Sequence, residues 1–554
     1  MEKGSKKVWP PFLPRFFEIE KPVSETIRDW AEFAPDRIAL SYYGRDLSYR
    51  ELNESMDRFA QGLLGMGLEK GDRVALFMQN CPQFVISYFG TMRAGGVVVA
   101  LNPMFKQAEL EYEINDAGAR ILASLDYLYP EVEKIKSQVG LEHVVLTSLG
   151  DYAPEGDPAL PLPPEARSVR PSFENTVDFV ELLDRSPNTP VCNVDDLKED
   201  LALLQYTGGT TGLPKGAMLT HHNLAYACTG TVYWYRHRYD DVHLGVTPFF
   251  HIMGMQQLMC TPLISGGRVV VLSRFDSRVT ARAIELYRCT YWVTATTSLI
   301  AFLDMQDIED YDFSSLRCLW SGGTPISVEI QNKIAKLAPN AIIGEGYGLT
   351  ECVSHGGTVT PLLRYKPGYV GIAQLNQVKI VDLETSQKDL PPGEEGEIVI
   401  KGPTIMKGYW NRPEETRDSM RDGWFYTGDI GVLDEEGYMK IVGRKKELIK
   451  CSGFSVFPSE VENLLFKHPA VSDVAVIGVP DPYRGESPKA FVVLKSDSQG
   501  RVSEEEIVAW CKENMSTYKR PRDVEFREDL PKSAAGKILR RVLSEGEKKG
   551  RERG

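Results

Sequence analysis

The chain has 554 residues, of which 42% are hydrophobic and 25% charged, a composition typical of a globular protein too long for one core. Its formal net charge of −13 argues against nucleic acid as its main partner. Its nine cysteines form no Cys-x-x-Cys pair, no stretch approaches the ~20 apolar residues of a bilayer span, and no signal peptide is visible, so we expect a cytoplasmic protein without disulfides, zinc or a transmembrane segment.

The first predicted helix begins at a capping box. Ser48 and Glu51 have the spacing in which each side chain caps a backbone N–H at the helix start. The residues that follow place an apolar face at helical spacing, namely Leu52, Met56, Phe59 and Leu63.

Strand and helix patterns then alternate. A helix over residues 83–93 separates two apolar runs. The alternation predicts βαβ units and a mostly parallel sheet. The expected buried strands are residues 73–78, 97–101, 268–272 and 291–295.

The regions from residue 151 onward differ in composition and in hydrophobic pattern. Residues 151–170 are rich in Pro, Glu and Gly and predict an exposed loop. After residues 391–393, the patterns at 397–400 and 437–442 predict a smaller β-rich section. The chain beyond Arg444 predicts an α+β unit of about 110 residues, and the charged residues 545–554 predict disorder. The unit's expected strands are 474–477 and 490–494, and its expected helices are 458–466 and 504–513.

A glycine- and threonine-rich segment follows the apolar residues 201–204. It contains Thr207, Gly208, Gly209, Thr210, Thr211, Gly212, Lys215 and Gly216. Glycine lets the main chain approach a ligand closely, and successive N–H groups in such a turn form an anion site. The segment is not a Walker A loop, because Pro214 precedes the lysine and Gly216 follows it where Ser or Thr would stand. It predicts a phosphate loop of another kind, and a polar hairpin tip is the alternative.

Four further segments carry side chains suited to a nucleotide: residues 346–351, 424–429, 443–447 and 531–537. Tyr347 offers an aromatic face for a base, Thr350 a hydroxyl for a phosphate, and Glu351 a carboxylate for a metal ion. Asp429 could accept hydrogen bonds from ribose, and Lys537 stands in a loop of small residues. Each alone is a weak signal, but their joint order is a strong one.

With these motifs together, the sequence resembles the adenylate-forming superfamily of acyl-CoA synthetases, luciferases and peptide-synthetase adenylation domains, from about residue 24 to 541. The resemblance implies that ATP activates a carboxylate to an acyl-adenylate with release of pyrophosphate, after which a thiol takes the acyl group. It also implies an α/β fold, with a large N-terminal domain of mixed and parallel sheets with helices plus a β-rich subdomain, and a small mobile α+β C-terminal domain.

The resemblance assigns the nucleotide site residue by residue. Thr207 to Lys215 would hold the β- and γ-phosphates, with Gly208 where relatives usually carry Ser. Tyr347, flanked by Gly346 and Gly348, would stack on adenine, and the loop with Gly322, Gly323 and Thr324 would lie beside the base and the acyl carbonyl. Thr350 would contact the α-phosphate and Glu351 would bind magnesium. Asp429 would bind ribose, with Arg444 assisting.

Three residues are assigned to the acyl transfer steps. Lys537 would bridge the attacking carboxylate and the α-phosphate during adenylation. His251 would border the acyl site and help separate the two half-reactions, although a single histidine near aromatics can be an ordinary core residue. Gly453 would lie along the channel for the pantetheine arm, with a tight β-turn as the alternative.

The resemblance also divides the chain into residues 1–443, a hinge at 444–446 and residues 447–554. Lys446 occupies the place of the hinge residue. Only residues 538–554 follow Lys537, too few to fold a carrier domain, so coenzyme A is the expected thiol.

The acid is less defined by the sequence. The segment before Thr350 lacks the tryptophans of acetate-type relatives and is similar to that of fatty-acyl and aryl ligases. The sequence shows no clear cationic partner for a second charge on the acid, so we expect an apolar monocarboxylic acid, with a medium- or long-chain fatty acid favoured over an aryl or alicyclic acid. Tyr226, Tyr233, Trp234, Tyr235, Met253, Met255 and Met259 could line its cavity or belong to the core. A catalytically inactive acyl- or nucleotide-binding relative is the non-enzyme alternative. Peripheral membrane contact and a homodimer stay open.

Overall fold

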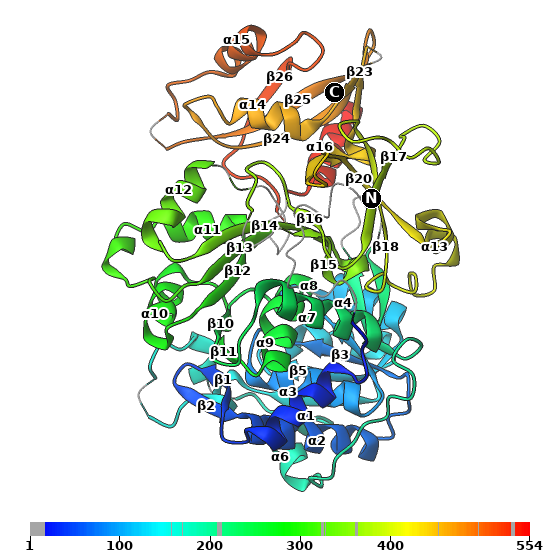
Figure 1. The fold of residues 1–554 in the computed structure, drawn as a ribbon, viewed down its shortest axis with the longest axis vertical. Helices are drawn as coiled ribbons and strands as arrows, with labels where there is room; N and C mark the ends of the chain where they lie inside the picture. The colour runs from blue at the N-terminus through cyan, green and yellow to red at the C-terminus, as the bar shows by residue number, and fades with distance from the viewer. Residues whose placement is uncertain are drawn as a thin grey trace.

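The computed structural model describes residues 17–156, 158–168, 170–207, 213–322, 326, 328–359, 364–452, 454–496, 498–532 and 538–553. Within these ranges the strands form four sheets, which we call I to IV. Sheets I and II form the body of the molecule, sheet III flanks it, and sheet IV lies above them (Figure 1).

Sheet I is parallel apart from its last pair, in which β8 and β9 run antiparallel. Its order is β7-β6-β5-β3-β4-β8-β9. The bounds are β3 Arg73–Phe77, β4 Val97–Ala100, β5 Ala119–Leu125, β6 His143–Thr147, β7 Val177–Asp178, β8 Leu201–Thr207 and β9 Lys215–Thr220.

Sheet II has the order β16-β15-β14-β13-β12-β10-β11-β1-β2, with a parallel centre from β14 to β1 and antiparallel edges. The bounds are β1 Ile38–Tyr42, β2 Arg45–Ser48, β10 Val242–Gly245, β11 Arg268–Val271, β12 Tyr291–Ala295, β13 Cys318–Gly322, β14 Ile342–Leu349, β15 Ser354–Val359 and β16 Ile372–Ala373.

Helices cover and connect these two sheets. The capping box at Ser48 is confirmed, because its side chain accepts from the Glu51 N–H and the Glu51 carboxylate accepts from the Ser48 N–H. The helices are α1 Val23–Phe33, α2 Tyr49–Gly65, α3 Pro82–Arg93, α4 Gln107–Ala117, α5 Tyr129–Glu133, α6 Phe179–Arg185, α7 His221–Tyr235, α8 Ile252–Gly254, α9 Thr261–Ser265, α10 Ser277–Tyr287, α11 Thr296–Leu303 and α12 Val328–Leu337. A π-helical turn, Met255–Cys260, joins α8 to α9.

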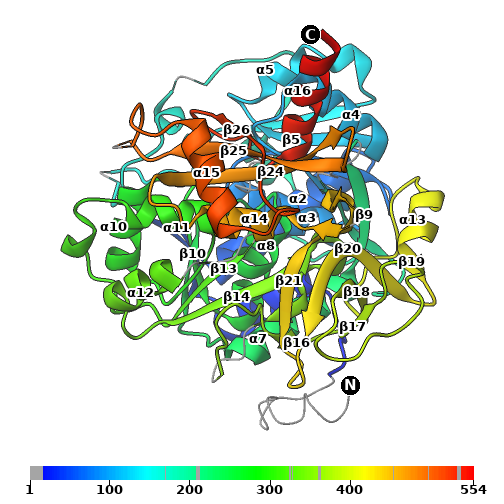
Figure 2. The ribbon, with the colours of Figure 1, turned by 90° about the horizontal axis from the view of Figure 1, so that it is seen from above.

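Sheets III and IV follow in the chain. Sheet III, the expected β-rich section, contains β17 Gln377–Val381, β18 Gly396–Lys401, β19 Met420–Arg421, β20 Trp424–Leu433 and β21 Met439–Arg444, with α13 Pro413–Ser419 beside them. Sheet IV contains β22 Ile449–Cys451, β23 Phe454–Val456, β24 Val471–Asp481, β25 Gly485–Leu494 and β26 Asp523–Phe526, with α14 Pro458–Leu465, α15 Glu504–Asn514 and α16 Arg540–Arg553. Seen from above, this last group spans the middle of the molecule (Figure 2).

The α/β class and the parallel strands expected from the sequence are confirmed. The expectation of disorder is wrong for residues 545–553, because α16 extends through Arg553. Leu543 is buried, and Lys489 forms an ion pair with Glu547 at 2.8 Å, so tertiary contacts stabilise a helix that local composition does not predict. The segment 151–170 is only partly exposed, since Tyr152 and Leu160 are buried.

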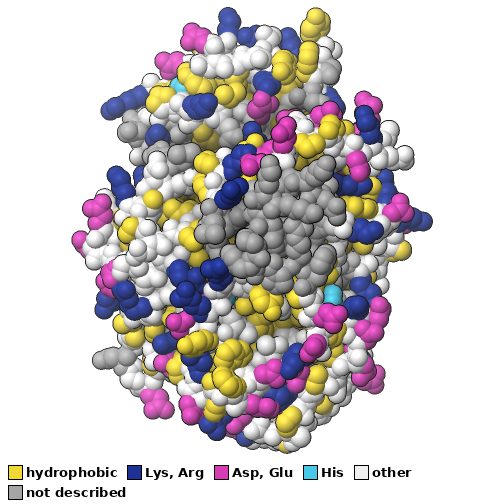
Figure 3. Space-filling model, in the orientation of Figure 1, with side chains coloured by type: hydrophobic (Ala, Val, Ile, Leu, Met, Phe, Trp, Pro, Cys, Tyr) yellow, Lys and Arg dark blue, Asp and Glu magenta, His cyan; other side chains and the backbone are white. Residues whose placement is uncertain are grey.

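The surface carries charges of both signs (Figure 3), and several of the aromatic and methionine side chains considered for the acyl cavity lie in the core. Lys and Arg are interspersed with Asp and Glu over the lower part of the face in Figure 3. None of the helices in the described part of the chain is long and apolar enough to cross a membrane. Trp234, Tyr235, Met255 and Met259 are buried core residues, whereas Tyr233 is largely exposed.

Candidate functional site

The ends of the phosphate loop are held together by the β8–β9 hairpin. Thr207 lies opposite Lys215 in its register, and Tyr206 lies opposite Gly216. Both predicted phosphate ligands, Thr207 and Lys215, therefore meet at the carboxyl end of β8, beside the carboxyl end of β4.

The residues predicted for the base and the ribose are in contact. The Tyr347 hydroxyl donates to Asp429 Oδ2 at 2.6 Å, and Arg444 Nε lies 2.8 Å from Asp429 Oδ1. Asp429 and Arg444 are also register partners on β20 and β21. The three side chains thus form one hydrogen-bonded group where sheet III meets sheet II.

Glu351 stands in a 3₁₀ turn, Thr350–Cys352, that packs against β8 and β9. Its Oε1 accepts from the Tyr409 hydroxyl at 2.8 Å, and the Lys215 ammonium lies 5.1 Å from the Tyr409 ring centre. Burial raises the pKa of Glu351. A carboxylate that loses hydration in this way is stabilised by a nearby cation.

Gly322, at the end of β13, lies close to Met253, two residues after His251. Gly322 and Gly346 are register partners at the ends of β13 and β14. A side chain on Gly322 would place its Cβ 3.3 Å from the Met253 sulfur, so the space there is limited. Gly348 lies on β14, two residues after Gly346, and is exposed.

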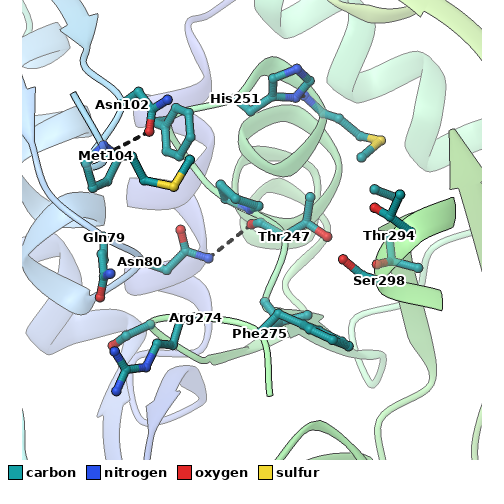
Figure 4. A pocket seen from close by; sticks show the side chains of 18 residues that line it. Gln79, Asn80, Asn102, Met104, Thr247, His251, Arg274, Phe275, Thr294 and Ser298 are labelled. Carbon is teal, nitrogen blue, oxygen red and sulfur yellow. Dashed lines mark hydrogen bonds between the residues drawn. The ribbon is translucent and has the colours of Figure 1, made fainter. Parts of the chain in front are cut away.

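A cavity of about 240 Å³ lies beside His251, between sheets I and II (Figure 4). The Nδ1 atom of His251 accepts from the Met253 N–H at 3.3 Å, and burial lowers the pKa of this histidine to about 4, so the ring is neutral near pH 7. The lining side chains include the amides Gln79, Asn80 and Asn102, the hydroxyl group of Thr247, and Arg274. Asn80 is fixed by donation to the Thr247 carbonyl at 3.0 Å.

Tyr409 and these cavity residues were not predicted from the sequence motifs. The amides follow directly on β3 and β4, Thr247 follows β10, and Arg274 follows β11. Ligands of open α/β sheets bind outside the carboxyl ends of parallel strands. Polar residues just after the predicted buried strands are therefore the signal that could have found them.

Several predicted site residues lie outside the described ranges. These are Gly208, Gly209, Thr210, Thr211, Gly212, Gly323, Thr324, Gly453 and Lys537. The predictions for them stay predictions.

A second cluster of possible metal ligands lies near the start of β10. In the part of the chain that the structure describes, His237, Asp241 and His243 have ligand atoms within 4.8 Å of one another. However, the Arg317 guanidinium lies 2.6 Å from Asp241 Oδ2, and the Thr290 hydroxyl donates to Oδ1 at 2.9 Å. This cluster lies at the amino ends of β10 and β13, away from the nucleotide residues, and an arginine already neutralises its carboxylate.

Comparisons with known proteins agree along nearly the whole chain. The family of AMP-binding enzymes matches residues 27–410, and the AMP-binding enzyme C-terminal domain matches residues 460–537. A long-chain-fatty-acid–CoA ligase of Bacillus subtilis is 38% identical over 98% of each chain, and one of Escherichia coli is 36% identical over 92% of this chain and 91% of its own.

Solved structures are similar too. ATP-bound MatB from Rhodopseudomonas palustris has a TM-score of 0.83 at 30% identity and covers 95% of this chain and 99% of its own. An anthranilate CoA ligase in complex with anthranoyl-AMP has a TM-score of 0.82 at 28% identity, covering 96% of this chain and 98% of its own.

Proposed function

The chain belongs to the family of AMP-binding enzymes, and on this premise we propose that it activates a long-chain fatty acid. It is an ATP-dependent, AMP-forming acid–CoA ligase. The observation that carries the choice of acid is the identity of 38% to a long-chain-fatty-acid–CoA ligase over 98% of both chains.

The reaction has two transfers. A carboxylate oxygen of the acid attacks the α-phosphorus of ATP, the bond to pyrophosphate breaks, and an acyl-adenylate forms. The sulfur of CoA then attacks the acyl carbon, the bond to AMP breaks, and the thiol proton leaves. In such chemistry the enzyme positions the reactants and stabilises charge rather than supplying a nucleophile.

We assign the adenylate to the group formed by Tyr347, Asp429 and Arg444. The assignment is supported by their mutual hydrogen bonds, which fix a ring face and a carboxylate next to each other. The ion pair with Arg444 orients Asp429, so that the carboxylate can accept from ribose hydroxyls. Thr207 and Lys215 would then contact the outer phosphates from the adjoining hairpin.

Glu351 would hold a magnesium ion. The fit rests on its donor atoms, because a carboxylate is a ligand type that this hard cation prefers, and on the burial that raises its pKa. When bound, the ion would neutralise phosphate charge. Tyr409 donates to one oxygen of Glu351 and thereby orients the carboxylate towards β8 and β9.

The cavity beside His251 would receive the thiol arm of CoA. This arm contains two amide groups, which need hydrogen-bond partners, and the amide and hydroxyl side chains of the lining supply them. Arg274 adds a charge suited to a phosphate. Asn80 and Thr247 already have partners within the protein, whereas Gln79 Oε1 is buried without one among the described residues and would accept from an amide of this arm. The lining also contains apolar side chains, among them Val246, Phe250 and Phe275, which suit the methylene groups of the arm and would equally suit an alkyl chain. Neutral His251 borders this space from the nucleotide side.

We further propose that residues 447–554 move as a body about the hinge at 444–446, relative to residues 1–443. Lys445 forms an ion pair with Glu397 of sheet III at 2.8 Å, whereas Glu447 binds Arg540 of α16 at 2.9 Å. The two sides of Lys446 are therefore tied to different parts of the molecule. A rotation there would let Lys537 serve adenylation and then withdraw before CoA enters.

A panel of fatty, alicyclic and aromatic acids tests the proposed substrate. We expect AMP and pyrophosphate formation that depends on acid and CoA, with the highest kcat/KM for long-chain fatty acids. A higher kcat/KM for an aryl acid would favour the aryl ligase alternative, and anthranilate belongs in the panel for this reason. Absence of acid-dependent AMP formation would favour a binding protein without activity.

A further inference from the structure

Two side chains of α4 reach the two flanks of the phosphate-loop hairpin. Tyr112 and Asp116 are four residues apart and therefore lie on one face of the helix. The Tyr206 hydroxyl donates to Asp116 Oδ2 at 2.7 Å, and the Tyr112 hydroxyl donates to the Pro214 carbonyl at 2.7 Å. One helix thus holds the residue before Thr207 and the residue before Lys215.

Arg412 connects these two contacts. Its Nη2 lies 2.6 Å from Asp116 Oδ1 and 3.3 Å from the Tyr112 hydroxyl oxygen. Asp116 has a side-chain exposure of 10%, and Arg412 of 30%, so the pair is partly shielded from water. A shielded charged pair that makes several hydrogen bonds fixes geometry more firmly than an exposed one.

The segment that carries Arg412 also reaches the predicted metal ligand. Tyr409 donates to Glu351, and the N–H of Trp410 donates to the Gly216 carbonyl of β9 at 2.8 Å. The indole N–H of Trp410 donates to the Asp116 carbonyl at 3.1 Å. Residues 409–412 therefore join Glu351, β9 and α4 into one connected group.

We propose that Asp116, with Tyr112 and Arg412, is a positioning residue for the triphosphate of ATP: it fixes Tyr206 and Pro214, and through them the spacing of Thr207 and Lys215 relative to Glu351. The proposal rests on the proposed function of that hairpin. None of the three residues needs to touch ATP. They act indirectly: if Thr207 and Lys215 are displaced, these residues stabilise the charge on the phosphate oxygens less well.

The contact pattern makes a specific prediction, because the hairpin would face only the outer phosphates. Asp116→Asn should weaken ATP binding on the order of 10-fold, since a charged hydrogen-bond partner is lost. Its adenylation turnover should fall on the order of 10- to 100-fold. AMP binding, and thioester formation from a chemically prepared long-chain acyl-adenylate, should stay at the wild-type level.

Tyr112→Phe provides a milder variant that keeps the ring and removes the hydroxyl with its bond to the Pro214 carbonyl and its longer contact with Arg412. It should show the same selective loss for ATP at a smaller magnitude, and it keeps the test valid if Asp116→Asn does not fold. Asp72→Asn is the matched control, because Asp72 pairs with Arg120 at 2.5 Å with similar side-chain exposures of 15% and 35%, at the amino ends of β3 and β5. It should bind ATP and AMP as the wild type does.

The measurements are the dissociation constants of ATP and AMP by calorimetry without acid, followed by the rates of the two half-reactions. The proposal is overturned if Asp116→Asn and Tyr112→Phe bind ATP normally. It is also overturned if ATP and AMP binding weaken equally, since that would indicate general support of the fold. Because calorimetry needs no acid, a wrong substrate assignment would appear only in the acid panel and would leave this test readable.

Discussion

The residues proposed to bind the nucleotide and the C-terminal domain, in which Lys537 is the predicted catalytic lysine, are held in different ways. Tyr347, Asp429 and Arg444 are bound to one another across two sheets. The C-terminal domain has its own core, centred on residues such as Val476, Val492 and Ile507. The chain passes from β21 to β22 through a short connection after Arg444. Substitutions in the hydrogen-bonded group and substitutions in the separately folded C-terminal domain should therefore change different steps of the reaction.

The largest expected effect lies in the C-terminal domain. Lys537→Ala should abolish pyrophosphate release from ATP and acid, because the compact ammonium charge between two anions is lost. The same variant should still form thioester from supplied acyl-adenylate and CoA, which a stopped assay of acyl-CoA would measure.

Lys532→Ala is the matched control, since Lys532 pairs with Asp473 at 2.7 Å in the same region. We expect it to retain both steps. Equal loss of both steps in Lys537→Ala would indicate misfolding or another role for this lysine.

The connection between the two regions should separate the half-reactions. Lys446 lies in a 3₁₀ turn, Lys445–Glu447, whose usual φ is close to the −65° that proline imposes. Lys446→Pro should therefore keep one arrangement and its half-reaction, which we expect to be adenylation, and lose the other. Lys446→Ala should keep both. A proline variant that completes both steps at ordinary rates would place the hinge elsewhere or remove the need for it.

A substitution at Glu351 should lower the turnover number much more than it weakens ATP binding. Glu351→Gln should lower turnover on the order of 10²- to 10³-fold, since one electrostatic contact to the reacting phosphate is lost. ATP binding should weaken much less. Tyr409→Phe, which removes only the hydroxyl donated to Glu351, should cost less turnover. Normal turnover of Glu351→Gln at saturating magnesium would remove this residue from the proposed metal site.

The parts of the structure that could be predicted from the sequence are those set by patterns within one segment, whereas contacts between distant residues could not be predicted. Strands such as β3 and β12 could be predicted because they are buried on both faces over four residues and are apolar apart from Arg73 and Thr294. Tyr347 and Asp429 are placed in one site through the family resemblance, because they are 82 positions apart in the chain and no local pattern joins them; their roles stay predictions. Tyr409 could not, since its partner Glu351 is 58 positions away in the chain. The helix α16 was missed for a similar reason, because Lys489, 58 positions from Glu547, stabilises it.

The smallest expected effect concerns stability in the framework beneath the site. His243 is buried on β10, and burial lowers its pKa from 6.5 to about 4. Between these two values the unfolded chain binds a proton that the folded chain does not, so stability is lost as pH falls below 6.5. From pH 7 to pH 5 this one group should cost about 2 kcal/mol. His243→Gln cannot titrate there, so the fall in its unfolding midpoint between pH 7 and pH 5 should be smaller than in the wild type, whatever its starting stability. Calorimetric scans of both proteins at the two pH values measure this difference. An identical pH dependence would show that His243 is already protonated in the folded protein or that the domain unfolds without exposing it.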